Sequence, residues 1–112
     1  MGKISTHVLD ISKGRPASNL PVVLEALNDE LWVEIGKGTT DADGRLKDLL
    51  TSETPLLKGT YRLKFNTASY FANGINYFYP EIVVIFTISN PNEQYHIPLL
   101  ISPFGYSTYR GV

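Results

Sequence analysis

The amino-acid sequence predicts an all-β protein, a sandwich of β-sheets built from short strands. Three observations lead to this fold class. Glycine and proline residues recur at short intervals, so the segments between them are brief. Several of these segments alternate apolar and polar residues, as strands with one buried face do. Only residues 67–73 have the features of a helix, so helices contribute little to the expected fold.

The first strand is expected at residues 4–10. Ile4 and Val8 fall on one face of this strand, and His7 falls on the other. His7 is therefore predicted to point away from Val8. A loop is expected at residues 12–16, where glycine and proline interrupt the alternation.

Turn signals place the elements that follow. The dipeptide Asn28-Asp29 predicts a hairpin that joins residues 22–27 to residues 31–39. The strongest turn is expected at residues 41–44, Asp-Ala-Asp-Gly, because Asp and Gly tolerate the positive φ angles of tight turns. Arg45 leaves that turn directly. Further strands are expected at residues 59–65, 82–88, 95–102 and 106–110.

Three features of these later elements carry specific expectations. Thr67 is a candidate N-cap of the short helix, and Gly74 is the residue expected to end it. Residues 82–88 are β-branched and aromatic, which predicts a strand buried on much of both faces. Pro98 lies inside the strand expected at 95–102 and has no N–H for the ladder, so it predicts an edge position, a bulge or an outward-facing nitrogen.

Composition bounds the domain count and the classes of partner. The 112 residues suffice for one domain over residues 1–112, since such domains usually span roughly 100–200 residues. The 10 Lys and Arg against 11 Asp and Glu give a net charge of -1, which argues against a nucleic-acid partner. Cysteine is absent, which excludes disulfides and thiol catalysis. No apolar run is long enough for a signal peptide or a membrane span, so a cytoplasmic location without membrane contact is expected.

The two histidines, His7 and His96, are the main candidates for chemistry. Both fall on outward-facing positions, because residues 95, 97, 99 and 101 form the core face of the strand that holds His96. A lone surface histidine is often only a solvated side chain. Beside Arg45 or Arg110, however, a neutral imidazole could take a proton from water while the guanidinium holds an oxyanion. Such a set suits hydrolysis of an anionic or carbonyl-rich substrate.

Three other patterns favour plain structure over chemistry. Residues 41–44 faintly resemble a calcium loop, but the glycine comes too early and no glutamate occupies the twelfth position. Residues 36–39, Gly-Lys-Gly-Thr, lack the spacing of a phosphate loop and a long helix after it. Ser5 is not expected to form a nucleophile with Thr6 and His7, because neighbours in a strand point to opposite faces. No pattern supports a metal site.

Several segments together resemble one protein family over essentially the whole chain. They are residues 4–10 (ISTHVLD), 14–17 (GRPA), 40–45 (TDADGR), 78–81 (FYPE), 95–103 (YHIPLLISP) and 106–111 (YSTYRG). In combination these segments resemble the 5-hydroxyisourate hydrolases, transthyretin-related enzymes of urate breakdown. The Asp-Gly turn and the proline-rich strand end are shared with transthyretin itself.

The resemblance implies a transthyretin-like β-sandwich of two four-stranded sheets with one short helix. It also implies a homotetramer, a dimer of dimers, whose active sites lie in the channel between dimers and use neither a metal nor an organic cofactor. The sheet that lines the channel would contain the first strand and the last two. That sheet would give His7 and His96 one shared surface, in agreement with the alternation.

The resemblance also implies site residues. The family's catalytic His, Arg and His correspond to His7, Arg45 and His96. Its terminal Tyr-Arg-Gly-Ser signature corresponds to the last four residues here. The implied substrate-binding set is His7, Arg45, Tyr109, Arg110, Gly111 and Val112. We expect water to attack a carbonyl of the six-membered ring of 5-hydroxyisourate, with His7 or His96 as base, and Arg45 to hold the oxyanion.

The chain departs from the family at its last residue, where Val112 stands in place of serine. If the serine hydroxyl positions water or substrate, its loss costs roughly 0.5–1.5 kcal/mol. If it transfers a proton, the loss reaches about 10²–10⁴-fold in rate. Two alternatives therefore stay open beside the hydrolase, a thyroid-hormone carrier of transthyretin type and a catalytically impaired hydrolase. The carrier lacks the His, Arg, His and Tyr-Arg-Gly set, which favours the enzyme.

Overall fold

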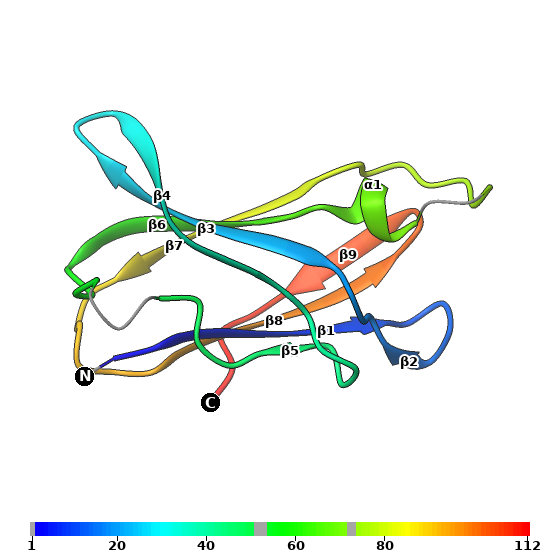
Figure 1. Ribbon diagram of the computed structural model, residues 1–112, viewed down its shortest axis with the longest axis horizontal. Coiled ribbons are helices and arrows are strands. Elements are labelled where there is room, and N and C mark those ends of the chain that lie inside the picture. The colour runs from blue at the N-terminus through cyan, green and yellow to red at the C-terminus, as the bar shows by residue number, and fades with distance from the viewer. Residues whose placement is uncertain (1, 51–53, 72–73) are drawn as a thin grey trace.

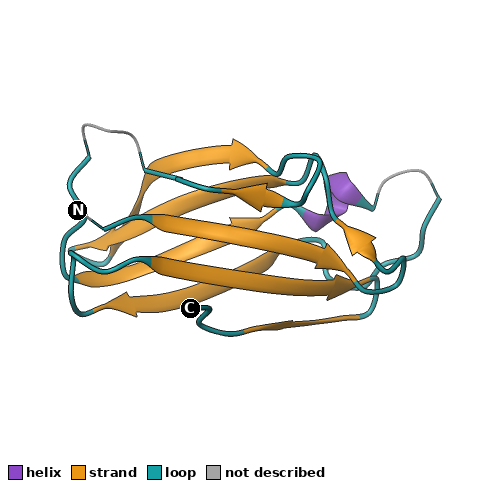
Figure 2. Ribbon diagram, turned by 90° about the horizontal axis from the view of Figure 1, so that it is seen from below, coloured by secondary structure: helices purple, strands orange, loops and turns teal. Residues whose placement is uncertain are grey.

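The computed structural model describes residues 2–50, 54–71 and 74–112, and in these residues two β-sheets pack face to face (Figure 1). The elements in chain order are β1 (Ile4–Asp10), β2 (Arg15–Pro16), β3 (Pro21–Asn28), β4 (Leu31–Thr39), β5 (Arg45–Leu46), β6 (Gly59–Phe65), α1 (Thr67–Tyr70), β7 (Ile82–Ile88), β8 (Tyr95–Ser102) and β9 (Gly105–Thr108). The helix lies at one end of the sandwich (Figure 2). The predicted all-β sandwich with a short helix is confirmed.

The two sheets differ in how their strands pair. One sheet has the order β4-β3-β6-β7, and all its pairs are antiparallel. The other has the order β2-β1-β8-β9, in which β1 and β8 run parallel to each other. This second sheet counts five strands because the two-residue β5 also pairs with β1, beside β2. The family resemblance implied four strands for this sheet. β2 was expected to be part of a loop and no separate strand was expected at residues 45–46, since two-residue strands carry no periodic pattern.

The core fills the space between the sheets. In β1 every second residue is buried, so Ile4 and Val8 face inward while His7 faces outward, as predicted. Phe65, Leu63 and Leu99 are among the fully buried side chains. Burial of each such side chain stabilises the fold by about 1.5–3 kcal/mol. The inner faces are therefore committed to packing, and polar chemistry is confined to the outer faces.

The strand β7 is less buried than its sequence suggested. Its outer residues Val83 and Ile85 are exposed, Ile85 to 62%. The expectation of burial on both faces is wrong because β7 is an edge strand, and none of the described elements covers its outer face. β-branched residues favour strands in general and do not by themselves indicate burial.

The hairpin turn between β3 and β4 is shifted by one residue from its predicted place. The β3–β4 hairpin turns at Asp29 and Glu30, which both have positive φ, rather than at Asn28 and Asp29. Two such residues in sequence match the backbone twist of a two-residue hairpin.

The helix begins at Thr67, the first residue of the predicted helix, but its cap lies one residue earlier than expected. Its N-cap is Asn66, not Thr67, and the Asn66 side chain accepts a hydrogen bond from the Ser69 backbone N–H at 3.0 Å. Thr67 is the first residue of the helix itself, and its side-chain hydroxyl donates a hydrogen bond to the Tyr79 carbonyl instead of capping the helix. Residues 72 and 73 of the expected helix lie outside the described residues.

Pro98 lies in a central strand, so the edge position is excluded. Regular pairing of β8 with β9 ends at Leu99 and Thr108, and the next pairing is an isolated bridge between His96 and Gly111. Pro98 falls in the gap between them, where its missing N–H breaks no ladder. The Thr108 hydroxyl donates to the Pro98 carbonyl at 2.7 Å and closes the gap.

Candidate active site

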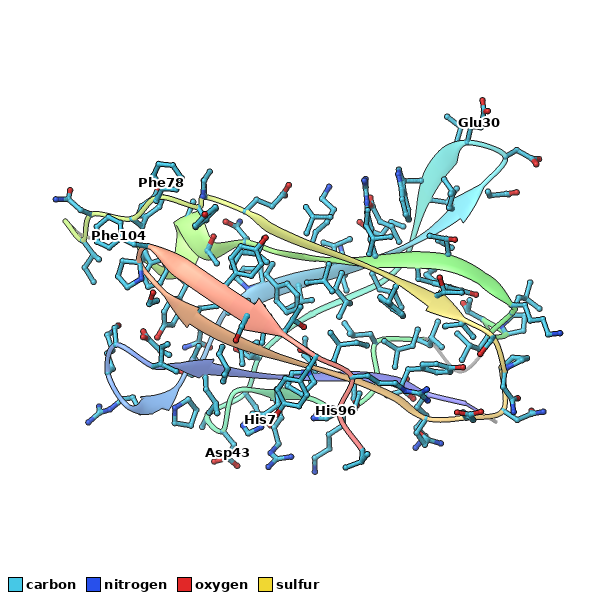
Figure 3. All side chains as sticks on the ribbon, turned by 180° about the vertical axis from the view of Figure 1, so that it is seen from behind. His7, Glu30, Asp43, Phe78, His96 and Phe104 are labelled. Atoms are coloured by element: carbon cyan, nitrogen blue, oxygen red, sulfur yellow. The ribbon has the colours of Figure 1, made fainter. Side chains whose placement is uncertain are left out.

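The outer face of the sheet that contains β1 brings three distant segments together. Arg45 in β5 lies directly opposite His7 in β1, and Ser5 in β1 lies directly opposite His96 in β8. Residues opposite each other on one face have Cβ atoms about 4.5–5.5 Å apart. Figure 3 shows His7 and His96 projecting from the same face. The two histidines and Arg45 therefore lie on one face of this sheet within a single chain.

The turn at residues 41–44 fixes the backbone of Arg45. The Asp41 carboxylate accepts hydrogen bonds from the backbone N–H groups of Asp43 and Arg45, both at 2.9 Å. The bond from Arg45 is the main reason why the pKa of Asp41 lies below its ordinary value. Gly44 has a φ of 77°, and a Cβ there would lie 2.3 Å from the Val8 carbonyl oxygen. Only glycine lets this turn pack so closely on β1.

The turn also holds the His7 ring. The Nε2 atom of His7 lies 2.9 Å from the backbone carbonyl oxygen of Asp43. A carbonyl oxygen only accepts, so Nε2 carries the proton. In the neutral ring Nδ1 is then the nitrogen with a free lone pair. The turn that presents Arg45 therefore also sets the tautomer of His7.

The His96 ring is held by a side chain instead. Its Nδ1 lies 2.9 Å from Ser5 Oγ, and this is its only ring hydrogen bond among the described residues. Burial is the largest cause that lowers the pKa of His96 below its ordinary value of 6.5, and electrostatic interactions with His7 and Arg45 lower this pKa further. His96 is thus neutral near pH 7 and able to accept a proton.

The C-terminal segment packs against the other side of His96. The Gly111 backbone N–H donates to the His96 carbonyl at 2.8 Å. A Cβ on Gly111 would lie 2.6 Å from Cδ2 of the His96 ring and 3.2 Å from Cγ of Pro98. The absence of a side chain at Gly111 is what allows the chain end to lie on the imidazole.

An open groove of about 630 Å³ lies on this face. Its lining includes Ser5, Arg45, Lys47, His96, Arg110 and Val112. Of the three cationic side chains in the lining, Arg110 is paired with Glu93, so Arg45 and Lys47 supply the positive charge that suits an anionic substrate. His7 adjoins the groove through its neighbour Arg45 but is not part of the lining.

Arg110 stands at the rim of the groove in an ion pair. Its guanidinium donates to Glu93 Oε1 at 2.8 Å and lies 4.6 Å from the centre of the Tyr95 ring. The bond from Arg110 is the largest cause that lowers the pKa of Glu93. Both side chains are well exposed, so solvent screens the pair, and it can open at little cost.

Two features were sought among the described residues, a cluster of metal ligands and a membrane-spanning helix. No group of three or more His, Cys, Asp or Glu side chains is arranged there to hold a metal ion. None of the described helices has the length and apolar character needed to cross a membrane.

Comparison with known proteins identifies the family. A family model described as Transthyretin, the HIUase/Transthyretin family, matches residues 4–111. The chain belongs to the HIUase/transthyretin family. It is 48% identical to the 5-hydroxyisourate hydrolase of Salmonella dublin over 96% of this chain and 79% of that protein.

Solved structures of proteins in this family have the same fold as this chain. The structure of Klebsiella pneumoniae 5-hydroxyisourate hydrolase matches with a TM-score of 0.85 and 35% identity over all of both chains. Sea bream transthyretin in complex with thyroxine matches with a TM-score of 0.88 and 33% identity over 98% of this chain and 95% of that one. The hydrolase and the thyroxine-bound transthyretin therefore share this backbone fold, so any difference in their functions must come from their side chains.

The terminal residues of this HIUase/transthyretin chain divide between two cavities. Gly111 and Val112 line the main groove with Arg45 and His96. Tyr109 lines a smaller cavity of about 220 Å³ between β7 and β8, which shares His96 and Arg110 with the groove. Tyr109 is 60% exposed, so its ring is free to turn toward either. The structure thus brings together all predicted site residues except Tyr109 and His7, which lie beside the groove.

Among the lining residues that were not predicted from the sequence, Ser5 and Lys47 bear on the chemistry of the groove. Ser5 was considered only with its chain neighbours, and the partner it meets is 91 residues away. Its spacing of two from His7 was the available signal, because it placed both residues on one face. Lys47 follows Arg45 by the same spacing of two in the sequence.

Proposed function

We propose that the protein is a hydrolase that opens the six-membered ring of 5-hydroxyisourate to give 2-oxo-4-hydroxy-4-carboxy-5-ureidoimidazoline. The observation that carries this proposal is one electropositive groove lined by both Arg45 and a neutral His96, with His7 beside Arg45. The names of the Salmonella and Klebsiella relatives support the same substrate.

In the proposed mechanism His96 takes a proton from water as the water oxygen adds to the ring carbonyl. The charge that develops on the carbonyl oxygen is held by the Arg45 guanidinium. The carbon–nitrogen bond then breaks, and His96 returns the proton to the departing nitrogen. The former carbonyl carbon is left as a carboxylic acid, which releases its remaining proton to solvent and becomes the carboxylate of the opened ring. His7, fixed by Asp43, orients substrate beside Arg45. No cofactor takes part.

The terminal segment would bind the substrate. Arg110 exchanges the exposed Glu93 for an anionic group of the ligand, and Tyr109 closes over it from the neighbouring cavity. Gly111 and Val112 contribute backbone groups at the groove floor. Val112 lacks the serine hydroxyl expected at this position, so this chain is proposed to be a slower enzyme than a serine-ended version.

The functional unit is proposed to be a homotetramer, a dimer of dimers, in the cytoplasm. β7 and β9 are the edge strands on the same side of the sandwich, since Tyr79, before β7, contacts Tyr106 of β9. Ile85 and Tyr106 on these edges are exposed, and open apolar edges favour pairing with a second chain. A second pair of subunits over the groove would exclude water from it and strengthen its electrostatics.

The deciding experiment mixes purified protein with freshly generated 5-hydroxyisourate and follows the decay of its ultraviolet absorbance. We expect the decay to accelerate in proportion to protein concentration. The matched control is His96→Ala at the same concentration, which should return the rate close to that of buffer. No acceleration by the unaltered protein would reject the hydrolase.

One alternative has an observation in its favour. The high TM-score of 0.88 to a thyroxine-bound transthyretin makes a hormone carrier the second candidate. The cationic side chains of Arg45 and Lys47 argue against it, because an apolar iodinated ring would offer these two charges no partner. Saturable thyroxine binding together with absent ring opening would favour the carrier, and absence of both would favour an impaired hydrolase.

A further inference from the structure

Ser5 and His96 form a contact that joins the two ends of the chain. Ser5 Oγ and His96 Nδ1 are 2.9 Å apart, and the two residues lie opposite each other in the parallel β1–β8 pair. Both are half-buried, and both line the groove. A hydrogen bond held by sheet register and partial burial has a fixed geometry, so Ser5 constrains how the ring can turn.

We propose that Ser5 is a positioning residue for the hydrolysis: its Oγ accepts a hydrogen bond from Nδ1–H of His96 and thereby presents the unprotonated Nε2 to water in the groove. The proposal rests on the proposed function for its catalytic meaning. The hydrogen bond and the tautomer are properties of the free protein and can be tested without substrate.

The direction of the hydrogen bond follows from the proton cycle. A base is neutral before the reaction and carries a second ring proton after it takes one from water. A serine oxygen can accept from Nδ1–H in both states, so the contact persists throughout. If Ser5 donated to Nδ1 instead, Nε2 would hold the proton, and the ring would have no free lone pair in the groove.

The Gly111 backbone covers a second side of the His96 ring. It lies against Cδ2, while Ser5 holds Nδ1. The edge left for the groove consists of Cε1 and Nε2. His7 is held differently, because its Nε2–H donates to the Asp43 carbonyl. The two rings therefore present opposite nitrogens, and only the one in His96 depends on a side-chain hydroxyl.

Ser5 is less suited to be a nucleophile itself. In a serine–histidine–carboxylate triad the ring nitrogen away from the serine is held by a third group. Here that nitrogen is Nε2 of His96, and none of the described residues bonds to it. Ser5 would then attack without an oriented base, which makes a covalent ester intermediate an outcome that contradicts the proposal.

The first test is the tautomer, measured by long-range ¹H–¹⁵N NMR of the histidine rings in the untagged protein. Two histidines give only four ring nitrogens to assign, and His7→Gln identifies each pair. We expect Nδ1–H for His96 in the unaltered protein and a shift toward Nε2–H in Ser5→Ala. The His7 signals should stay unchanged, and Ser89→Ala, which removes an exposed serine hydroxyl, should alter neither ring.

The second test is kinetic. Ser5→Ala should lower kcat about 3- to 10-fold, the effect of one hydrogen bond, while KM changes less than about twofold. Ser5→Thr keeps the hydroxyl and should recover most of kcat. Loss of the acceptor destabilises the protonated ring, so the acidic limb of the pH–rate profile should move to lower pH in Ser5→Ala but not in Ser89→Ala.

The outcomes separate this inference from the proposed function. An Nε2–H His96 in the unaltered protein, an unchanged spectrum in Ser5→Ala, an unchanged kcat in a folded Ser5→Ala, or an ester on Ser5 would each overturn the positioning role. If the spectra behave as expected but the unaltered protein opens no ring, the hydrolase is rejected while the Ser5–His96 hydrogen bond stands.

Discussion

His7 and His96 lie on neighbouring strands of one sheet, yet their surroundings are opposite in kind. His7 is held by a backbone carbonyl of a turn that glycine and aspartate build, whereas His96 is held by the Ser5 hydroxyl and covered by the chain end. Side-chain and terminal partners can change without altering the fold, and a backbone partner cannot. Substitutions can therefore change the surroundings of His96 more readily than those of His7.

The largest expected effect is loss of the groove histidine or the arginine. His96→Ala and Arg45→Ala should each reduce ring opening by about 10²–10⁴-fold, because one removes the base and the other the oxyanion partner. His7→Ala should cut the rate sharply as well, but less than His96→Ala, since His7 does not line the groove. Steady-state kinetics check this order, and near-normal turnover in all three variants would remove the mechanism.

A smaller effect is expected from filling the space beside His96. Gly111→Ala places a methyl group 2.6 Å from Cδ2 of the ring, so the ring or the chain end must move. We expect kcat to fall about 10-fold with little change in Tm, because a small misplacement of a base slows proton transfer. Gly105→Ala is the matched control, since its Cβ would lie 3.8 Å from the nearest atom. Equal kinetics of the two variants would contradict the packing argument.

The rate of ring opening should depend on pH through the protonation of His96. The pKa of His96 is lowered, so ring opening should persist below pH 6.5 and fail only as pH drops through that lower value. Over the same window the unfolded chain takes up a proton first, so stability also decreases as pH falls. Arg45→Gln removes a positive charge and should raise the pKa of His96, measured by NMR titration. A midpoint at or above 6.5 in the unaltered protein would contradict this.

The smallest effect is expected at the chain end. Val112→Ser restores a hydroxyl at the groove and should raise kcat about 3- to 10-fold, the value of one hydrogen bond. Val112→Ala is the control for the loss of the valine side chain. An unchanged or lower rate in Val112→Ser would show that the hydroxyl is not what this groove lacks.

Much of the fold could be predicted because its signals are local. Alternation placed β1, β6 and β8, and the Asp-Ala-Asp-Gly turn placed Arg45 at the start of β5. Errors arose where a neighbour in space decides the outcome. One such error is β7, which was expected to be buried because its residues are apolar. A neighbouring strand likewise decided among the alternatives left open at Pro98, because pairing with β9 is interrupted there. The residues of β7 and β8 do not by themselves indicate whether each strand lies at the edge or in the centre of its sheet.

The sequence by itself determined which faces the two histidines occupy, because side chains in a strand alternate with a period of two. It also determined the rigid turn before Arg45, because that turn is built from four consecutive residues. Only the tertiary structure decided that β1 pairs in parallel with β8, and therefore that Ser5 meets His96 across 91 residues. Register between distant strands depends on the packing of the whole core, and short-range patterns do not contain it.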